Sequence, residues 1–310
     1  MKKVSIIVPV YFNEENLLSL YADLKEKVLN KLPSYNLAYE IVFVDDGSKD
    51  NSYNILKDIA KLDENIVLLK LSRNFGEHAA LLAGLTKCTG DFAVRKAADL
   101  QEPSELILKM IDKYNEGNNV VIATRADREE PFIQKALSGL YASIMQKMAL
   151  HNMPKGGFDS FLIDRQVIDV LVKMQEKNTS LMSQILWSGF KTGSVSYTRL
   201  KRQAGKSRWT LSKKIKLAID SILSFSYFPV RFISVIGILS SLGALITSIV
   251  IICLKLADVI DVEGYTSIIL LILFCFGVVM FSLGVLGEYI WRAFDASRKR
   301  PPFIVEEDHK

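Results

Sequence analysis

Residues 40–62 read EIVFVDDGSKDNSYNILKDIAKL. The run from Glu40 to Val44 is mostly apolar and rich in β-branched residues, which is typical of a buried strand. From Ser52 to Leu62 the apolar residues recur at helical spacing, and the Asp, Gly and Ser between the two segments favour a turn. This stretch therefore predicts a strand followed directly by a helix, the repeating unit of a parallel sheet.

The same alternation continues on both sides, from residue 4 to about residue 195. Strands are predicted at Val4–Val10, Glu40–Val44, Ile66–Leu71, Asp91–Val94 and Val120–Ala123, and helices at Asn16–Leu29, Ser52–Leu62, His78–Leu85 and Pro103–Tyr114. Such a pattern implies right-handed crossovers and an α/β fold, a mainly parallel sheet covered on both faces. Ligands of such sheets bind beyond the carboxyl ends of the strands, so the residues that follow each strand are the candidates for chemistry.

The C-terminal part of the chain is apolar. The 310 residues have a mean hydropathy of +0.20. No charged residue occurs from Phe232 through Leu254 or from Thr266 through Gly287. Each run exceeds the roughly 20 residues that cross a hydrocarbon core. We therefore expect a two-helix transmembrane hairpin, Phe232–Leu256 and Thr266–Tyr289, and exclude a purely soluble protein; two buried core helices are the alternative.

A basic segment precedes the hairpin. Eight Lys and Arg residues and no acid lie between Arg199 and Lys216. They overlap an amphipathic stretch, Leu211–Phe228, that ends in aromatic residues, a composition typical of helices in the lipid headgroup interface. The alternative is a solvated basic connector.

Charge also predicts the orientation. The loop Ala257–Tyr265 carries acids and no Lys or Arg, whereas both flanks of the hairpin are basic. The positive-inside rule then places both termini in the cytoplasm and the protein in the plasma (inner) membrane. The expected organisation is a cytoplasmic α/β domain (1–198), a juxtamembrane segment (199–230), two transmembrane helices (231–290) and a cytoplasmic tail (291–310).

Other classes of protein are excluded by composition. The three cysteines cannot form a disulfide framework, because two of them, Cys253 and Cys275, lie in the apolar runs. No Cys/His cluster has the spacing of a zinc site. The N-terminus lacks the apolar core and cleavage site of a signal peptide. The net charge of +5 is modest, and no nucleic-acid partner is expected.

Polar residues follow the first two predicted strands. Pro9, Tyr11 and Asn13 lie where a strand gives way to a helix, whose N-terminal N–H groups favour anions. Asp45 and Asp46 end the second strand, and adjacent carboxylates are unfavourable unless a ribose, a base N–H or a metal binds them. A helix cap and a turn would produce the same patterns.

The next two strands are followed by further candidates. Arg73 offers a fork suited to phosphate or carboxylate. His78 could titrate near neutrality, although a histidine at a helix start is more often structural. Asp99 and Gln101 project to the same side of an extended chain and could share one hard divalent cation, Mg²⁺ or Mn²⁺, with diphosphate oxygens completing its shell.

Taken together, these motifs resemble a known family. The set comprises Pro-Val-Tyr with Asn-Glu-Glu (9–15), Val-Asp-Asp-Gly-Ser (44–48), Ser-Arg-Asn-Phe-Gly (72–76) and Ala-Asp-Leu-Gln-Glu-Pro (98–103), with Gln-Ala-Gly-Lys-Ser (203–207) before the hairpin. It is similar to the family 2 glycosyltransferases of the GT-A (Rossmann-like) fold. More narrowly, it resembles the polyisoprenyl-phosphate glycosyltransferases, the group of bactoprenol glucosyltransferase and dolichol-phosphate mannose synthase.

The resemblance implies an activity: inverting transfer of a hexose from a nucleotide sugar, in our expectation a UDP-sugar, to polyprenyl (undecaprenyl) phosphate, giving a lipid-linked donor for cell-envelope glycans. The residues assigned to the nucleotide sugar are Pro9, Tyr11, Glu14, Asp45, Asp46, Arg73 and Ala98. Asp99 and Gln101 would hold the metal and the diphosphate, Asp99 also being a candidate catalytic residue. One position departs from the family's Asp-x-Asp-x-Gln, because Ala97 replaces the first Asp and puts the metal dependence in doubt.

The acceptor is an anion, so the site needs charge neutralisation and positioning more than a strong base. The candidate cations are Arg125, Arg128, Lys135, Arg202 and Lys206, each of which could instead be a solvated charge. Asp159 is the candidate base or acceptor orienter, and a helix cap is the alternative.

A second hypothesis, motivated by Ala97, is a membrane scaffold of the same fold that binds lipid or nucleotide without turnover. A processive polysaccharide synthase is excluded, because only two spanning helices are present and Trp209 lacks the expected Gln upstream. The family resemblance also suggests a homotetramer. The identity of the sugar stays open.

Overall fold

The computed structural model describes residues 1–126, 146, 153–154, 157–158, 160–174, 176, 179–200, 220, 228–257 and 264–309. The chain divides into two compact units. The first is Met1–Ser221 together with Pro301–Lys310, and the second is Ile222–Arg300.

The first unit contains one eight-stranded sheet with the order β7-β5-β6-β4-β1-β2-β3-β8. The strands are β1 (Lys2–Val10), β2 (Leu37–Asp45), β3 (Ile66–Leu71), β4 (Phe92–Arg95), β5 (Val120–Arg125), β6 (Ser160–Asp164), β7 (Thr192–Tyr197) and β8 (Val305–His309). Strands β4, β1, β2 and β3 are parallel neighbours, and β7 is parallel to β5. Strand β6 is antiparallel to both β4 and β5, and β8 is antiparallel to β3.

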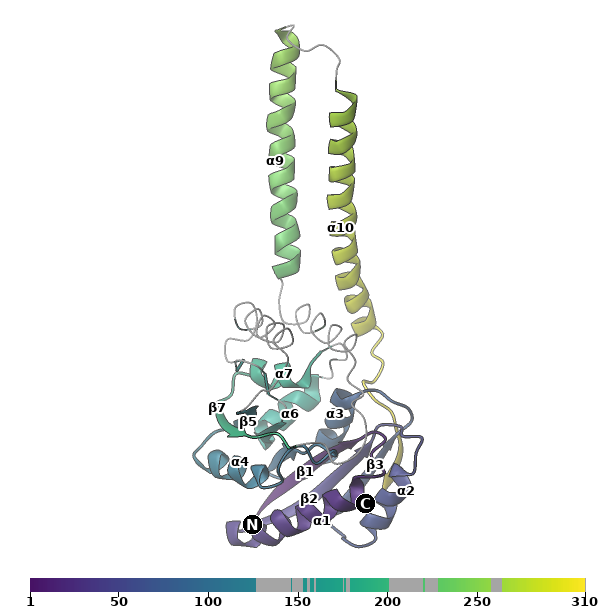
Figure 1. Ribbon diagram of the computed structural model, residues 1–310, viewed down its shortest axis with the longest axis vertical. Coiled ribbons are helices and arrows are strands. Elements are labelled where there is room, and N and C mark those ends of the chain that lie inside the picture. Colours follow the sequence, from purple (N-terminus) through teal and green to yellow (C-terminus); the bar gives the residue numbers. More distant parts are fainter. Residues whose placement is uncertain are drawn as a thin grey trace. The chain divides into compact units, whose positions relative to one another are not determined.

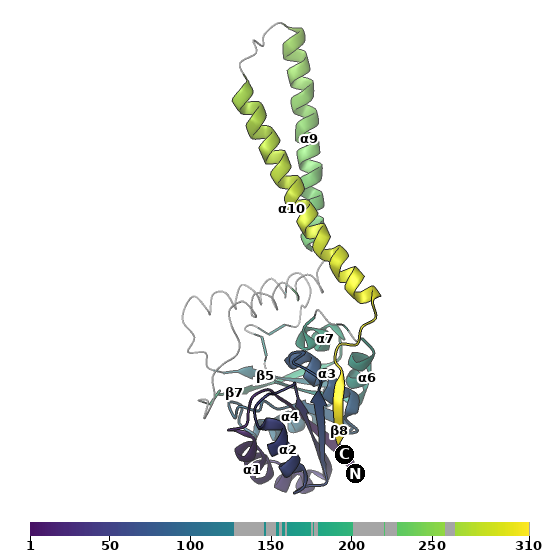
Figure 2. The same ribbon diagram turned by 90° about the vertical axis from the view of Figure 1, so that its right-hand side faces the viewer.

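Helices cover both faces of this sheet, as Figures 1 and 2 show. They are α1 (Leu17–Lys27), α2 (Ser52–Ala60), α3 (Glu77–Lys87), α4 (Leu106–Asn115), α6 (Arg165–Met174) and α7 (Leu181–Trp187), with a 3-10 helix η1 (Leu29–Tyr35). The alternation within β1 and β2 sends Ile6 and Phe43 into one core with α1, α2 and α4. The opposite face meets α3 closely, because a Cβ on Gly84 would lie 2.5 Å from Ile7 Cγ2.

The five predicted strands and four predicted helices of this unit are all present, and each predicted range overlaps the observed one. The expected α/β architecture with a mainly parallel sheet is therefore confirmed. Strands β6, β7 and β8 and helix α7 were not anticipated, whereas α6 is the helix near Asp164 that Asp159 would cap in the alternative interpretation. In particular, the segment predicted as a tail (291–310) contains regular structure, because its last residues form the edge strand β8.

The edge strand β8 is held by its side chains as well as by its backbone. Lys70 of β3 forms ion pairs with Glu306 at 2.9 Å and Glu307 at 3.2 Å. The Tyr53 hydroxyl donates a hydrogen bond to Glu307 at 3.0 Å. Just beyond β3, the Ser72 N–H donates to the carbonyl of Ile304 at 3.0 Å. The end of the chain thus covers the edge of β3 that leads into the Arg73 loop.

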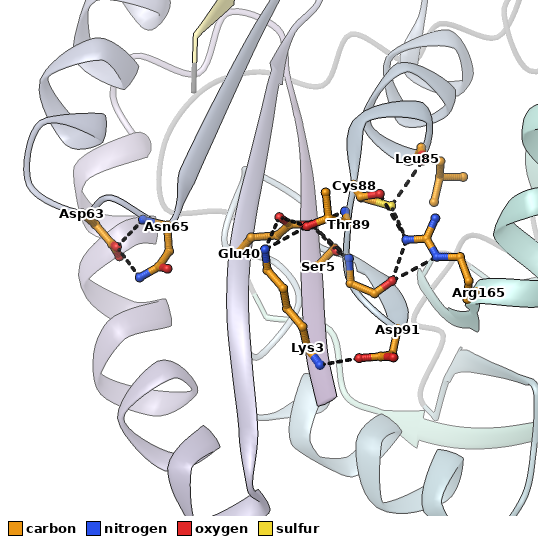
Figure 3. A network of polar contacts seen from close by, with 11 residues as sticks. Lys3, Ser5, Glu40, Asp63, Asn65, Leu85, Cys88, Thr89, Asp91 and Arg165 are labelled. Carbon is orange, nitrogen blue, oxygen red and sulfur yellow. Dashed lines mark hydrogen bonds and ion pairs between the residues drawn. The ribbon is translucent and has the colours of Figure 1, made fainter. Parts of the chain in front are cut away.

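A buried polar network lies at the amino ends of β1 and β2 (Figure 3). The Glu40 carboxylate accepts hydrogen bonds from Lys3 Nζ at 2.7 Å, from Ser5 Oγ at 2.6 Å and from the Thr89 N–H at 2.6 Å. Burial would raise the pKa of Glu40, but these donors outweigh it and lower the pKa to about 2. This end of the sheet is tied together by a carboxylate that stays ionised.

The second unit contains two long helices, α9 (Phe228–Leu256) and α10 (Tyr265–Ser297). Both predicted hairpin segments are therefore helical, and α10 continues beyond the predicted end. Within the described residues, Phe274–Ser297 is long and apolar enough to cross a membrane, and Val230–Ser240 is a shorter apolar helical stretch. Most of the predicted juxtamembrane segment (199–230) lies outside the described residues.

Candidate functional site

The candidate site lies at the carboxyl ends of four neighbouring parallel strands. The register pairs Val10 with Asp45 and Asp45 with Lys70, so β1, β2 and β3 end at the same edge of the sheet. Strand β4 ends at Arg95, which pairs with Ile7 of β1. The loops that follow these strands therefore meet at one edge, as the sequence predicted.

The paired acids at the end of β2 are both buried, with Asp45 0% and Asp46 3% exposed. Asp46 Oδ1 accepts a hydrogen bond from the Phe75 N–H at 2.7 Å, and Oδ2 accepts from the Gly76 N–H and from Asn74 Nδ2, both at 2.9 Å. Asp46 thus holds the loop that follows β3. Asp45 faces the Ser48 N–H at 3.3 Å, in the manner of a turn.

The ionised forms of Asp45 and Asp46 are disfavoured in this structure. Burial raises the pKa of Asp46 to about 6, although the Phe75 and Gly76 N–H groups oppose it and the charge of Asp45 adds to it. Burial likewise raises the pKa of Asp45. Donor groups of a bound ligand that reached Asp45 would stabilise its ionised form.

A close backbone approach joins the Asp45–Asp46 turn to the Arg73 loop. Gly47 has a φ of +69°, and a Cβ there would lie 2.5 Å from the carbonyl carbon of Arg73. Only glycine fits both the left-handed conformation and this contact. The Arg73 side chain is exposed and its guanidinium lies 4.1 Å from the centroid of the Phe75 ring.

The loop after β1 is locked to the turn after β2. The Phe12 N–H donates to Ser48 Oγ and the Asn13 N–H donates to Ser52 Oγ, both at 3.0 Å. Glu14 accepts a hydrogen bond from the Asn51 N–H at 2.8 Å. Tyr11 lies in this loop, half-buried, with its ring edge-on to Phe12. The structure thus brings Tyr11 and Glu14 to the same loop cluster as the paired acids.

The turn after β4 carries Asp99 and Gln101. Asp99 Oδ1 accepts a hydrogen bond from the Gln101 N–H at 3.2 Å. The Gln101 carbonyl accepts from the Leu200 N–H at 2.9 Å, and the Gln101 amide oxygen accepts from the Arg199 guanidinium. The first residues of the basic segment therefore bind directly to this turn, a contact that the sequence did not predict.

The donor set of this turn fits a hard divalent cation. A carboxylate and an amide supply oxygen ligands only, which Mg²⁺ and Mn²⁺ prefer, although the Gln101 oxygen would have to exchange the Arg199 guanidinium for the cation. Within the described part of the chain no three His, Cys, Asp or Glu residues come together as a metal group. Two protein oxygens are too few for a dedicated cage, so the set suits a cation that arrives with a diphosphate.

Four charged side chains lie behind the turn, at the end of β4. Arg95 forms an ion pair with Glu77 at 2.6 Å and another with Glu102. Lys96 is 1% exposed and donates a hydrogen bond to the Glu102 carbonyl. Burial lowers the pKa of Lys96, although nearby acids oppose it. Sequence reasoning missed this cluster, because charged residues that end a strand look like solvated ones.

His78 lies in surroundings that fit a structural role, the interpretation that the sequence favoured. Both of its ring nitrogens are buried and have no hydrogen-bond partner among the residues that the structure describes. Burial lowers the pKa of His78, with Arg95 adding to the effect and Glu77 opposing it. The imidazole is therefore neutral at neutral pH.

The other predicted site residues divide into two groups. Pro9 pairs with Val44 inside the sheet, Ala98 is 5% exposed, and Arg125 ends β5 opposite Tyr197. Arg125 thus lies at the end of a strand beyond β4 and β6 in the sheet order. The remaining candidates, Arg128, Lys135, Asp159, Arg202 and Lys206, lie outside the described residues.

Comparison with known proteins agrees with this arrangement. Residues 5–172 match the family described as Glycosyl transferase family 2. The chain is 37% identical over 306 residues to "Uncharacterized glycosyltransferase YkcC" of Bacillus subtilis, covering 98% of this chain and 94% of the relative. It is 35% identical to "Prophage bactoprenol glucosyl transferase homolog" of Escherichia coli, covering 99% and 100%.

Two further matches are a relative with a similar sequence and a protein of known structure. "Bactoprenol glucosyl transferase" of Shigella phage SfII is 33% identical and covers 99% of both chains. A solved mannosyltransferase of Pyrobaculum calidifontis, in complex with GDP-Man and Mn²⁺, is 16% identical with a TM-score of 0.48 and covers 69% of this chain and 60% of its own. The family profile spans more than half of the chain and the relatives span nearly all of it, so this α/β protein belongs to glycosyl transferase family 2, with the GT-A fold.

Proposed function

We propose that this chain transfers a hexose from a UDP-sugar to undecaprenyl phosphate at the cytoplasmic face of the plasma membrane. The observation that carries the proposal is the meeting of the Asp45–Asp46 turn and the Asp99–Gln101 turn at one sheet edge, in a chain with a membrane-length apolar helix. The relatives named for bactoprenol, a polyprenol, support the choice of acceptor.

The donor occupies the loops after β1, β2 and β4. Asp45 and Asp46 lie beneath the nucleoside, Asp45 accepting from ribose or base and Asp46 holding the loop that bears Arg73. Asp99 and Gln101 hold a divalent cation, Mg²⁺ or Mn²⁺, which supplies charge neutralisation at the diphosphate when bound. Arg73 is exposed beside this edge and is available to the diphosphate.

The reaction is a single inverting displacement. An oxygen of the lipid phosphate forms a bond to the anomeric carbon while the bond from that carbon to the diphosphate breaks, and the nucleoside diphosphate leaves with the electron pair. The attacking phosphate oxygen is already ionised, so the chain's task is positioning and electrostatic stabilisation. Arg125, with Arg128, Lys135, Arg202 and Lys206, is assigned to the acceptor phosphate, and Asp159 orients the acceptor.

Helices α9 and α10 form the membrane hairpin in this proposal. Ile238, Leu239 and Phe274 are 60%, 63% and 65% exposed in the second unit, and apolar side chains exposed in such numbers suit lipid rather than water. Trp291 and Phe294, near the end of α10, suit the aromatic belt at the interface. Both termini are cytoplasmic, and the homotetramer expected from the family stays a prediction.

A transfer assay tests the proposal. The full chain in liposomes is given undecaprenyl phosphate and a panel of radiolabelled UDP- and GDP-sugars, with Mg²⁺ or Mn²⁺ against EDTA. Lipid-linked product from one donor, lost with EDTA, is the expected result. Nucleotide binding without product from any donor would contradict the proposal and favour the scaffold hypothesis that Ala97 motivates.

A topology experiment tests the membrane part separately. An epitope tag inserted after Ala257 should be protected from proteases and antibodies applied to the cytoplasmic side. Tag cleavage from that side, with the membrane intact, would overturn the proposed hairpin.

A further inference from the structure

The turn that contains Asp99 has a strained backbone conformation at Leu100. Leu100, at its centre, has a φ of 57°, a left-handed conformation that a leucine rarely adopts, and its side chain is 6% exposed. Such a conformation persists only where the surrounding structure over-determines it. The question is which groups hold it.

Glu102 is the centre of the contacts that close this turn. Its carboxylate accepts a hydrogen bond from the Ala97 N–H at 3.3 Å and pairs with Arg95, and its backbone carbonyl accepts from Lys96. Glu102, at the end of the turn, is therefore bound directly to Ala97 at its start. The side chains of Arg95, Lys96 and Glu102 come from one short stretch, 95–102, which also contains Asp99 and Gln101.

The charges in this cluster are buried, which stability alone does not favour. The side chains of Arg95 and Glu102 are 10% and 6% exposed, and Lys96 is 1% exposed as a residue. The free energy lost when such charges are removed from water often exceeds the free energy gained from their attraction. A protein with apolar residues of similar volume in their place is commonly as stable. A buried cluster of this kind is better explained if its hydrogen bonds and ion pairs fix the conformation of the turn.

The cluster also connects the two halves of the candidate site. Arg95 reaches Glu77 at the start of α3. Gly76, the residue before Glu77, donates its N–H to Asp46 at 2.9 Å. Hydrogen bonds and ion pairs, together with the peptide bond between Gly76 and Glu77, thus connect the paired acids after β2 to the turn after β4.

We propose that Arg95, Lys96 and Glu102 are positioning residues that fix the Ala97–Gln101 turn, so that Asp99 meets the donor diphosphate. The inference rests on the proposed function and deepens it. Ala97 contributes no carboxylate to the site, so donor affinity depends on how well the turn fixes the remaining acid, Asp99. The cluster therefore sets the affinity for donor and cation and does not itself contact the reacting atoms.

The chain offers a matched control at the other end of the sheet. Glu40 is, like Glu102, a buried glutamate that binds a cationic side chain and a backbone N–H, but it lies at the amino ends of the strands (Figure 3). Glu102→Gln and Glu40→Gln remove the same charge from comparable surroundings. Only the first lies behind the candidate site.

The experiment measures donor-side binding and turnover of the full chain in detergent micelles. UDP and GDP, each with Mn²⁺, are titrated by calorimetry, and donor KM and kcat are then measured with the accepted sugar. Glu102→Gln should weaken nucleotide–Mn²⁺ binding and raise donor KM by about 10- to 100-fold, the usual effect of losing a group that orients a ligand, with a smaller change in kcat. Glu40→Gln should leave both values within about twofold, whatever it does to the thermal midpoint.

Lys96→Met provides a second variant, because an apolar side chain of similar length keeps the volume filled. It should keep the thermal midpoint near that of the unaltered chain and still weaken nucleotide–Mn²⁺ binding. Donor affinity unchanged in both Glu102→Gln and Lys96→Met would overturn the inference while leaving the proposed function intact. Failure of the unaltered chain to bind either nucleotide would overturn both.

Discussion

Asp46 Oδ1 lies 2.7 Å from the backbone nitrogen of Phe75, and this hydrogen bond joins the end of β2 to the loop after β3. The sequence left two interpretations of the paired acids open, a bound ligand or a helix cap and turn. In the structure Asp46 organises a loop, and both of its oxygens are engaged. Its effect on a donor therefore acts through the position of that loop.

Asp46→Asn should destabilise the fold. The amide offers one acceptor oxygen where two are used, so its NH₂ group would face the Phe75 or the Gly76 N–H. A buried unsatisfied donor costs about 1–3 kcal/mol, and we expect a loss of that size in the free energy of unfolding. Thermal denaturation of the full chain measures it; an unchanged midpoint would show that the loop does not depend on Asp46.

Gly47→Ala should be more harmful than Gly76→Ala. Both glycines have positive φ, +69° and +98°, so both substitutions carry a backbone cost of about 1–3 kcal/mol. A Cβ at Gly47 would also meet the Arg73 backbone at 2.5 Å, whereas no described atom lies within 4 Å of one at Gly76. Thermal midpoints of the two variants give the comparison, and equal losses would contradict the close approach.

Asp99→Ala should reduce transfer by at least about 100-fold, because the variant loses the carboxylate assigned to the cation and diphosphate. The thermal midpoint should change little, since the substitution removes one hydrogen bond of the turn, from the Gln101 N–H, and leaves the Glu102 contacts in place. Initial rates with the identified donor test this expectation. Turnover near that of the unaltered chain would remove Asp99 from the catalytic site.

Acid should destabilise the first unit through Glu40. The pKa of Glu40 is about 2 in the fold against 4.5 as its ordinary value. A lowered pKa means that the fold binds the ionised form, so this stabilisation is complete above pH 4.5 and is lost as the pH falls toward 2. The difference corresponds to roughly 3 kcal/mol.

The pH dependence of the thermal midpoint measures this contribution. Glu40→Gln should be less stable than the unaltered chain at pH 7, and the gap between the two should narrow between pH 4.5 and 3. A gap that stays constant across this range would show that Glu40 does not titrate with folding.

Deletion of residues 304–310 should expose the edge of β3. The deletion removes the backbone pairing with β8, the hydrogen bond from Ser72 to Ile304 and the ion pairs of Lys70. Hydrogen exchange should then accelerate in the peptide 66–76, and the protein should aggregate more readily through the unpaired edge.

Glu306→Gln is the control for this deletion. It removes one partner of an exposed ion pair, which is worth about 0–1 kcal/mol, and leaves the backbone pairing intact. If this variant and the deletion accelerate exchange equally, the ion pairs rather than the strand protect the edge.

The strands at the centre of the sheet could be predicted from the sequence because they are buried on both faces. Ile66–Leu71 and Glu40–Val44 are mostly apolar runs, each with one charged residue, and short runs of this kind bounded by turn residues are typical of central strands in a parallel sheet. Strands β7 and β8 could not be found in this way. The residues TGSVSY and VEEDH are largely polar, as sheet-edge strands tend to be, and have no apolar pattern to detect.

The candidate site was predicted in part for the same reason. The positions of Asp45, Asp46, Asp99 and Gln101 follow from where the strands end, which local sequence reveals. Their partners do not follow from it. That Asp46 binds the 74–76 loop and that Gln101 binds Arg199 depends on segments far apart in the chain coming together.

Local sequence was enough to establish the alternation of strands and helices, the edge at which polar residues gather, and the apolar runs of the C-terminal part, because periodicity and composition are local properties. The burial of Lys96, the closing of the Asp99 turn by Glu102 and the completion of the sheet by the end of the chain emerge only in the folded molecule. A charged side chain looks the same in a sequence whether it meets water or a partner, and its partner is chosen by the fold.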